Sequence, residues 1–242
     1  MANALYKHWF VDFGPFKTGK FIESELGMIP EGWKIWTIGE IANIIDCLHS
    51  KKPELTLENN GNIFLQLENI LDNGLLDLSK KYFISDEDYK KWTSRIEVKF
   101  GDCVITNVGR SGAVSRIPHD ITAAMGRNMT AIRLKETFPF PGYLITMLCS
   151  PSMKLTISKH LDVGTILEAL NVKSIPKLHF FAPDNTDLIY KTESHFKEFR
   201  NKMEQNIKEN TSLKQTRDYL LPKLISGEIQ VKQAAKLAKQ VL

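Results

Sequence analysis

The sequence lacks any run of the roughly eighteen consecutive apolar residues that a transmembrane helix needs, so it predicts no membrane span. It also has no basic and apolar leader at its start, so no signal peptide is expected. Cysteine is scarce: Cys47, Cys103 and Cys149 are odd in number, widely spaced and never form a C-x-x-C pair. They suit a reducing cytoplasm and are expected to be buried apolar residues, not metal ligands or nucleophiles.

Recognisable catalytic motifs are absent as well. The histidines share no metal-ligand spacing, and neither a Gly-x-Ser-x-Gly elbow nor a His-Glu-x-x-His motif occurs. Residues 14–20 (GPFKTGK) resemble a phosphate-binding loop, but Phe21 stands where Ser or Thr would hold magnesium, and a helix-like segment precedes them instead of a strand. We therefore expect no nucleotide site, no cofactor and no metal, and a binding module is favoured over an enzyme.

Length and composition are those of an ordinary globular protein. The chain has 242 residues, of which 43% are hydrophobic and 25% charged, enough for one or two domains with a substantial core. The formal net charge is +4. This mild excess permits a polyanionic partner without demonstrating one.

A long helix is predicted near the C-terminus, over about residues 186–224. Apolar and polar positions recur there at alternating spacings of three and four, which is a heptad pattern. Such a helix exceeds what one modest domain needs, so we expect it to act as a spacer that pairs with another long helix. The positions assigned to this spacer and dimerisation seam are Phe196, Phe199, Met203, Asn206, Asn210, Leu213, Arg217 and Leu220. Asn206, Asn210 and Arg217 interrupt the seam with polar groups, which in coiled coils fix register or partner choice.

The chain before this helix shows many short β segments and few helices. Turn signals at residues 60–62 and 72–74 bound short apolar stretches, and Ser85 before three acidic residues predicts a helix start. Residues 103–106 and 113–117 predict a strand and its return across the loop 109–112. The fold class expected is therefore α+β: a β-rich globular domain followed by a long coiled-coil-forming α-helix.

Basic residues are concentrated between Cys103 and Lys135. Five of them (Arg110, Arg116, Arg127, Arg133 and Lys135) stand in this window against Asp120 alone. Arginine offers a planar fork suited to phosphate and to the major-groove edge of guanine, and flanking glycines let a backbone approach phosphate closely. The alternative is a set of solvated surface charges around a β-rich core.

Four segments resemble the specificity subunits of type I restriction–modification systems. Residues 4–13 (ALYKHWFVDF) resemble the end of the family's central conserved helix, and residues 25–33 (ELGMIPEGW) resemble the entry to a target recognition domain. Residues 101–106 (GDCVIT), followed by Gly109 and Gly112, are similar to that domain's central strand and loop. Residues 213–229 (LKQTRDYLLPKLISGEI) resemble the distal conserved helix and its end.

The resemblance implies a half-length, non-catalytic specificity subunit with one target recognition domain where a full member has two. It implies double-stranded DNA, methyltransferase and restriction subunits, and a second copy or another half-subunit as partners, with no membrane. It divides the chain into residues 1–14 (remnant of a conserved helix), 15–184 (target recognition domain), 185–226 (spacer and dimerisation helix) and 227–242 (basic tail). The DNA contacts predicted are Asn107, Arg110, Ser111, Arg116, Arg127 and Asn128, with Lys51, Lys52, Gln66 and Asn69 as further donors.

Two other functions remain open from the sequence. A coiled-coil interaction protein whose head binds protein instead of DNA is favoured by the near-neutral head, since residues 30–182 hold 18 basic against 17 acidic residues. A stand-alone enzyme is disfavoured, because no catalytic constellation is assembled.

Overall fold

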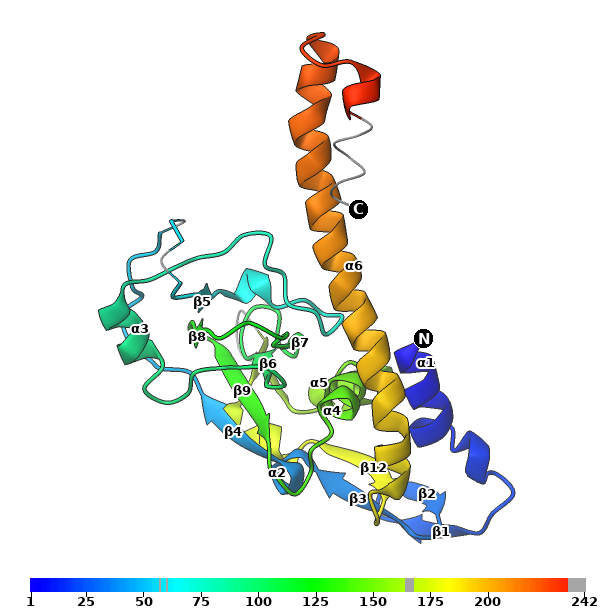
Figure 1. Cartoon of the computed structure of the whole chain (residues 1–242). Coiled ribbons are helices and arrows are strands. Elements are labelled where there is room, and N and C mark those ends of the chain that lie inside the picture. Colours follow the sequence, from blue (N-terminus) through cyan, green and yellow to red (C-terminus); the bar gives the residue numbers. More distant parts are fainter. Residues whose placement is uncertain (57, 60, 164–167, 235–242) are drawn as a thin grey trace. The chain divides into compact units, whose positions relative to one another are not determined.

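The computed structural model describes residues 1–56, 58–59, 61–163 and 168–234. It confirms an α+β fold, with short strands and helices followed by one long helix (Figure 1). The elements are α1 (Ala2–Tyr6), a π-helical turn (Lys7–Val11), a 3-10 turn (Gly14–Phe16), β1 (Phe21–Ser24), β2 (Gly27–Pro30), β3 (Trp33–Thr37), α2 (Ile38–Ile41), β4 (Ala42–Asp46), β5 (Phe64–Leu65), a 3-10 turn (Leu67–Asn69), α3 (Asp86–Trp92), β6 (Cys103–Thr106), β7 (Val114–Arg116), β8 (Ala124–Met125), β9 (Met129–Leu134), α4 (Pro141–Leu148), α5 (Pro151–Ser158), β10 (Leu161–Val163), β11 (Glu168–Leu170), a 3-10 stretch (Val172–Lys177), β12 (His179–Pro183) and α6 (Asp187–Ile225).

A four-stranded antiparallel sheet in the order β4-β9-β6-β7 lies at the centre of the fold. Side chains along a strand alternate between its two faces. Cys103, Ile105 and Ile132 accordingly join one hydrophobic cluster, whereas Val104 and Ala131 join another. Because both faces of the sheet are buried, β6 has a continuous apolar sequence instead of an alternating one.

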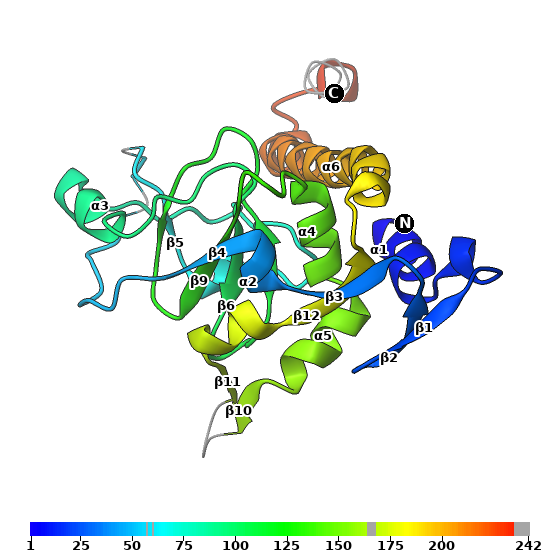
Figure 2. The ribbon, with the colours of Figure 1, turned by 90° about the horizontal axis from the view of Figure 1, so that it is seen from below.

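Helices and a second strand pair cover one side of this sheet. β3 and β12 pair antiparallel, and α5 packs beside β12 (Figure 2). The N-terminal helical segment joins the same core through its aromatic rings. Tyr6 stacks on Phe10 with ring centroids 5.2 Å apart, and Phe10 meets Tyr143 of α4 edge-on at 5.0 Å. Contacts of this kind add to the free energy gained from burial alone.

The first turns of α6 are held to α4 by a buried carboxylate. The first turn of a helix has backbone N–H groups without partners inside the helix, and Phe140, at the N-cap of α4, forms no side-chain cap. Glu193 supplies one from α6: its Oε1 accepts from the amide of Gly142 at 2.9 Å and its Oε2 from that of Tyr143 at 2.7 Å. A Cβ on Gly142 would lie 2.8 Å from the backbone nitrogen of Lys197, so this close approach requires glycine.

The chain forms two compact units, residues 1–199 and 200–242, and α6 runs from one into the other. The predicted long helix is confirmed: α6 has 39 residues, which at 1.5 Å per residue makes it about 58 Å long. The beginning of its heptad pattern serves the first unit's own core. Phe196 is fully buried there and Phe199 packs against the same cluster. The prediction that Phe196 belongs to the dimerisation seam is therefore wrong, because its side chain is fully buried in the first unit and cannot contact a partner helix.

Polar seam positions farther along α6 are exposed. These positions are Asn206, Asn210 and Arg217. Leu213 is 38% exposed, whereas Leu220 is 7% exposed inside the second unit, and Met203 is half-buried. The helix includes Pro222 and ends at Ile225, close to the predicted end near residue 224, and Gly227 in the following turn has a positive φ (+76°).

Other expectations have mixed outcomes. The predicted helix start at Ser85 is confirmed, since its Oγ accepts from the amide of Asp88. All three cysteines are buried, as expected. Residues 14–16 form a 3-10 turn after a π-helical turn, which is not the strand–loop–helix of a phosphate-binding loop. Within the described ranges no helix is both long and apolar enough to cross a membrane. The second half of the predicted basic tail, residues 235–242, lies outside the described residues.

Glu193→Ala is expected to lower the free energy of unfolding by about 2–4 kcal/mol, because it leaves two buried amides of α4 without acceptors. Urea denaturation followed by circular dichroism measures the loss. Glu198→Ala is the matched control, an exposed glutamate on the same helix, and its effect should stay within about 0.5 kcal/mol. Equal effects of the two substitutions would contradict the capping role.

Candidate nucleic-acid interface

Strand pairing brings three loops to one edge of the central sheet. β9 pairs antiparallel with β4, so the segment that follows Asp46 emerges beside the start of β9. β6 also pairs antiparallel with β9, and the amide of Asn107 donates to the carbonyl of Asn128 at 2.8 Å. Residues 47–52, 107–112 and 126–128 thus share one edge, which we call the loop edge. Residues distant in sequence meet here because β9 has a partner on each side.

A further pair of short strands adds Gln66 to this group. β5 and β8 run parallel, with Leu65 opposite Met125, so the residues after each strand leave in the same direction. The amide of Gly126 donates to the carbonyl of Leu65 at 3.0 Å. A Cβ on Gly126 would lie 2.6 Å from that oxygen, which explains why glycine occupies this position.

Between these segments lies a cavity of about 470 Å³, which we call the β5–β8 cavity. Four of the ten predicted DNA-contacting residues line it: Lys52, Gln66, Arg127 and Asn128. Its other lining residues are Leu55, Phe64, Leu67, Glu68, Tyr82 and Trp92. Lys52 and Arg127 are exposed, while Gln66 and Asn128 are half-buried. The structure therefore places two cations and two amides around one hollow.

Two buried aromatic rings are among the residues that line the β5–β8 cavity. Phe64 and Trp92 meet edge-on with ring centroids 5.0 Å apart and belong to a small core cluster with Ile84 and Ala124. Trp92 is 2% exposed, and its indole Nε1 has no acceptor among the described residues. At the rim, the hydroxyl of Tyr82 donates to Glu68. Sequence reasoning missed these walls, because no local pattern links residues so far apart in the chain.

The turn carrying Arg127 and Asn128 has a strained but defined backbone. Asn128 adopts a left-handed conformation (φ +63°), which asparagine tolerates better than most residues. Its neighbour Met129 accepts from the amide of Cys47 at 3.2 Å, so the turn is tied to the end of β4. Backbone hydrogen bonds thus fix the turn from which both side chains project.

Arg110 and Ser111 lie on the loop 107–112, outside the β5–β8 cavity. Arg110 is exposed, and its Nη2 lies 3.0 Å from Oδ2 of Asp72. The hydroxyl of Ser111 lies within hydrogen-bond distance of the carbonyls of Glu168 (2.7 Å) and Asn107 (2.9 Å), so its single hydrogen is used within the fold. Arg110 therefore remains available to a ligand, at the cost of one surface ion pair, which is a weak interaction.

Three predicted contacts lie in the interior instead. Arg116 is 1% exposed beneath the ring of Phe100. The side-chain amide of Asn107 donates to the carbonyl of Leu170 at 3.0 Å and accepts from the Thr130 hydroxyl at 2.9 Å. Asn69 is 3% exposed and donates to two backbone carbonyls. Buried polar groups with partners inside the fold cannot reach a DNA groove without breaking those bonds. The prediction that these three residues contact DNA is therefore wrong, and they support the fold instead.

Two more basic residues of the arginine-rich window are also structural. Arg133 binds Asp102 through two parallel hydrogen bonds, of 2.8 and 2.5 Å, and Asp102 is almost fully buried. Lys135 donates to the carbonyl of Gly39 at 2.6 Å. The count of basic residues in the sequence therefore suggested more DNA-contacting cations than the surface offers. A count does not show which side chains are bonded to acceptors within the fold.

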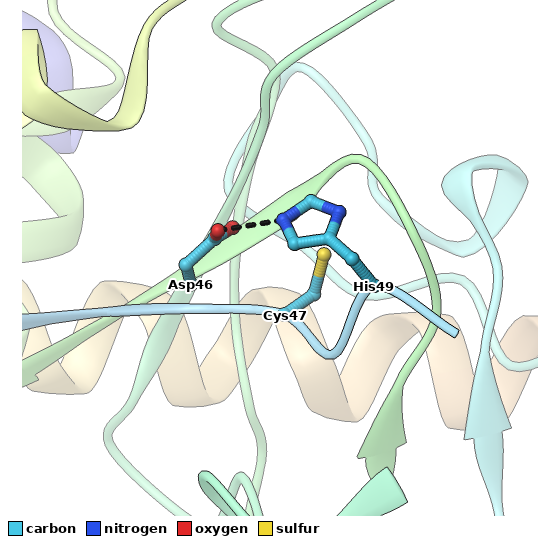
Figure 3. Close-up of side chains that lie close together, drawn as sticks. All are labelled: Asp46, Cys47 and His49. Carbon is cyan, nitrogen blue, oxygen red and sulfur yellow. Dashed lines mark hydrogen bonds and ion pairs between the residues drawn. The ribbon is translucent and has the colours of Figure 1, made fainter.

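The loop 47–52 begins with a compact polar cluster. Nε2 of His49 lies 2.7 Å from Oδ2 of Asp46, with the sulfur of Cys47 beside them (Figure 3). Arg95, a cation that sequence reasoning did not single out, donates to the Cys47 carbonyl at 2.8 Å and lies 3.7 Å from Asp46. Burial raises the pKa of the Cys47 thiol and so disfavours the thiolate that metals bind. We interpret the cluster as an anchor that directs Lys51 and Lys52 outward.

Comparison with known proteins agrees with the family resemblance. No protein-family model matches the chain. Over 96% of its length the chain is 27% identical to the type I restriction enzyme MjaIX specificity subunit of Methanocaldococcus jannaschii, of which it covers 53%. The chain thus spans about half the length of this curated relative.

Solved structures show the same fold. The S subunit of a type I restriction–modification system from M. genitalium aligns over 80% of the chain and 46% of its own, with a TM-score of 0.57 and 16% identity. The HsdS subunit from Thermoanaerobacter tengcongensis aligns over 91% of the chain and 46% of its own, with a TM-score of 0.51 and 14% identity. A structure described as showing complex assembly and conformational transition of the type I R-M system aligns over 92% of the chain and 50% of its own, with a TM-score of 0.55 and 15% identity. The chain therefore resembles type I specificity subunits in sequence and in fold, in a half-length form.

Substitution of Asn107 and of Arg110 should show that the first residue stabilises the fold and that the second lies on the surface. Asn107→Ala removes two buried hydrogen bonds and is expected to lower the free energy of unfolding by about 2–3 kcal/mol. Arg110→Ala removes one surface ion pair and should change it by less than about 1 kcal/mol. Urea titrations of both variants measure this difference. A destabilisation by Arg110→Ala as large as that by Asn107→Ala would contradict the assignment.

Proposed function

We propose that this chain is the DNA specificity subunit of a type I restriction–modification complex in the cytoplasm, with its first unit reading one half of a bipartite target. The similarity to specificity subunits supports the family role. The observation that carries the assignment to this chain's own residues is the convergence of Lys52, Gln66, Arg127 and Asn128 around one cavity. The chain itself is non-catalytic in this proposal, and methyltransferase and restriction subunits supply the chemistry.

The chemistry of the loop edge suits duplex DNA. Arg127 offers a bidentate fork to guanine, and the amides of Gln66 and Asn128 match the major-groove edge of adenine. Lys51 and Lys52 are exposed point charges suited to phosphate, which fixes register without reading sequence. Arg110 extends the contact surface along the loop 107–112. Asn69, Asn107 and Arg116 support these loops from within.

We assign the spacer function to α6 beyond the first unit. Asn206, Asn210, Leu213 and Arg217 are its exposed seam positions, available to a second copy or to another half-length subunit. Two such chains would supply the two recognition domains of a bipartite target. In this arrangement residues 1–14, residues 15–184 and the first turns of α6 form the recognition head. The rest of the predicted spacer segment, residues 200–226, holds two heads at a set distance, with 227–242 as a basic tail.

A protein-binding head without DNA affinity is the alternative. Exposed apolar residues on the first unit favour it, among them Leu155 (65% exposed) and Met28 (55% exposed). A titration of the chain against random duplex DNA across a range of salt concentrations separates the two. Affinity that falls with salt supports the DNA role, whereas a dimer without such affinity, even with the methyltransferase subunit present, supports the alternative.

Arg127→Ala and Lys52→Ala should weaken DNA binding in different ways. Loss of Arg127 is expected to cost about 1–3 kcal/mol and to relax the preference at one base pair. Loss of Lys52 should weaken all sequences alike and reduce the slope of log affinity against log salt by about one. Binding to a selected target and its single-base variants measures both effects. Lys20→Ala, an exposed lysine outside the cavity, should leave affinity and preference unchanged, and unaltered base preference in Arg127→Ala would contradict its reading role.

Insertion of one heptad near Asn210 is expected to lengthen the unread spacer of the preferred target, because the helix sets the separation of the two recognition heads. Seven residues add about 10.5 Å of helix. Target selection from a library of half-sites at varied separations, in the presence of the methyltransferase subunit, measures the preferred spacing. A substitution-only variant of the same segment is the control, and an unchanged spacing would refute the spacer role.

A further inference from the structure

We propose that the β5–β8 cavity binds a single nucleobase that has turned out of the DNA duplex. This inference rests on the DNA binding proposed above and specifies what one part of the interface accepts. Reading base edges in a groove requires projecting side chains and does not require a hollow. The β5–β8 cavity is a hollow of about 470 Å³, within the size range of sites for small ligands.

The walls of the cavity have the composition of a base-binding pocket. Enzymes that extrude bases hold them by stacking between aromatic and apolar side chains. Tyr82 supplies half-buried aromatic surface, and Leu55 and Leu67 supply half-buried apolar surface. Phe64 and Trp92 also line the cavity but are only 1% and 2% exposed, because they pack edge-on against each other. Stacking of a base in this cavity would therefore use mainly Tyr82 and the two leucines.

Polar groups in the cavity match the edge of a base. The amides of Gln66 and Asn128 both line the cavity. Nε2 of Gln66 donates one hydrogen to the carbonyl of Leu65 at 3.2 Å, and its second N–H group remains for a ligand. The amide of Asn128 offers donors and an acceptor. Two half-buried side chains from two separate segments thus supply hydrogen-bonding groups to one cavity.

The lining of the cavity includes a carboxylate as well as two cations. Glu68 accepts a hydrogen bond from the hydroxyl of Tyr82, and a phosphate placed against it would be repelled. A carboxylate instead accepts well from the exocyclic amino group of adenine or cytosine. Lys52 and Arg127 are exposed and suited to the phosphates on either side of a turned-out nucleotide.

Three otherwise identical hairpin duplexes test the proposal with the full chain. One is fully paired, one carries a single unpaired adenine, and one carries an abasic site at the same position. The duplex with the unpaired adenine is expected to bind at least about tenfold more tightly than the paired one, because the cost of extrusion is already met. The abasic duplex is equally flexible but has no base to insert, so it should show no such gain.

Asn128→Gly removes one amide while keeping the left-handed backbone, and is expected to reduce the preference for the unpaired adenine. Gln66→Leu should do the same if the first variant folds poorly. Asp120→Gly is the matched control, since Asp120 has the same φ of +63° and lies outside the cavity. Its ratio of affinities for unpaired and paired duplexes should equal that of the unaltered chain.

The outcomes separate this inference from the proposed function. Salt-dependent binding with equal affinity for all three duplexes would overturn the cavity proposal and leave the DNA role intact. Equal gains for the unpaired and abasic duplexes would also overturn it, because flexibility alone would then explain the preference. Absence of salt-dependent binding to every duplex would overturn the proposed function itself, and this inference with it.

Discussion

The candidate interface depends on the pairing of β9 with both β4 and β6. This pairing places the end of β4, the end of β6 and the start of β9 at one edge of the sheet. Loops that are roughly 20 to 80 residues apart along the chain thereby lie close enough to bind one ligand. The turn at Gly126 then brings Gln66 to the same group of loops, because the amide of Gly126 donates to the carbonyl of Leu65, the residue before Gln66. The loops can vary in sequence while these backbone hydrogen bonds keep them in place.

A second constraint ties the beginning of α6 to the head. Glu193 occupies the first-turn amides of α4, and Phe196 completes an aromatic cluster with Tyr6, Phe10 and Tyr143. Burial raises the pKa of Glu193, and the two amide donors oppose that shift. Because this carboxylate replaces a local cap, α4 is completed only when α6 is in place. The same helix thus contributes to the core of residues 1–199 and continues into the second unit.

The positively charged residues of the chain divide into two groups with different roles. Arg133 and Lys135 bond acceptors inside the fold, and Arg116 is buried. Lys52 and Arg127 remain exposed beside a cavity with aromatic walls. A small net charge of +4 is compatible with DNA binding on this account, because the charge that matters is local. In the proposed function, the first unit recognises DNA and the part of α6 beyond it sets the spacing.

Local patterns in the sequence determined much of the secondary structure. The heptad spacing predicted α6, Ser85 before three acids predicted α3, and the apolar run at residues 103–106 predicted β6, because each depends on neighbours within a few residues. The family resemblance likewise rests on contiguous segments that the sequence alone displays. Only the tertiary structure decided that Asn107 and Arg116 are interior, that Phe196 belongs to the chain's own core, and that Gln66 meets Arg127 and Asn128. Burial and proximity arise from strand pairing between distant segments, and residue type does not encode them locally.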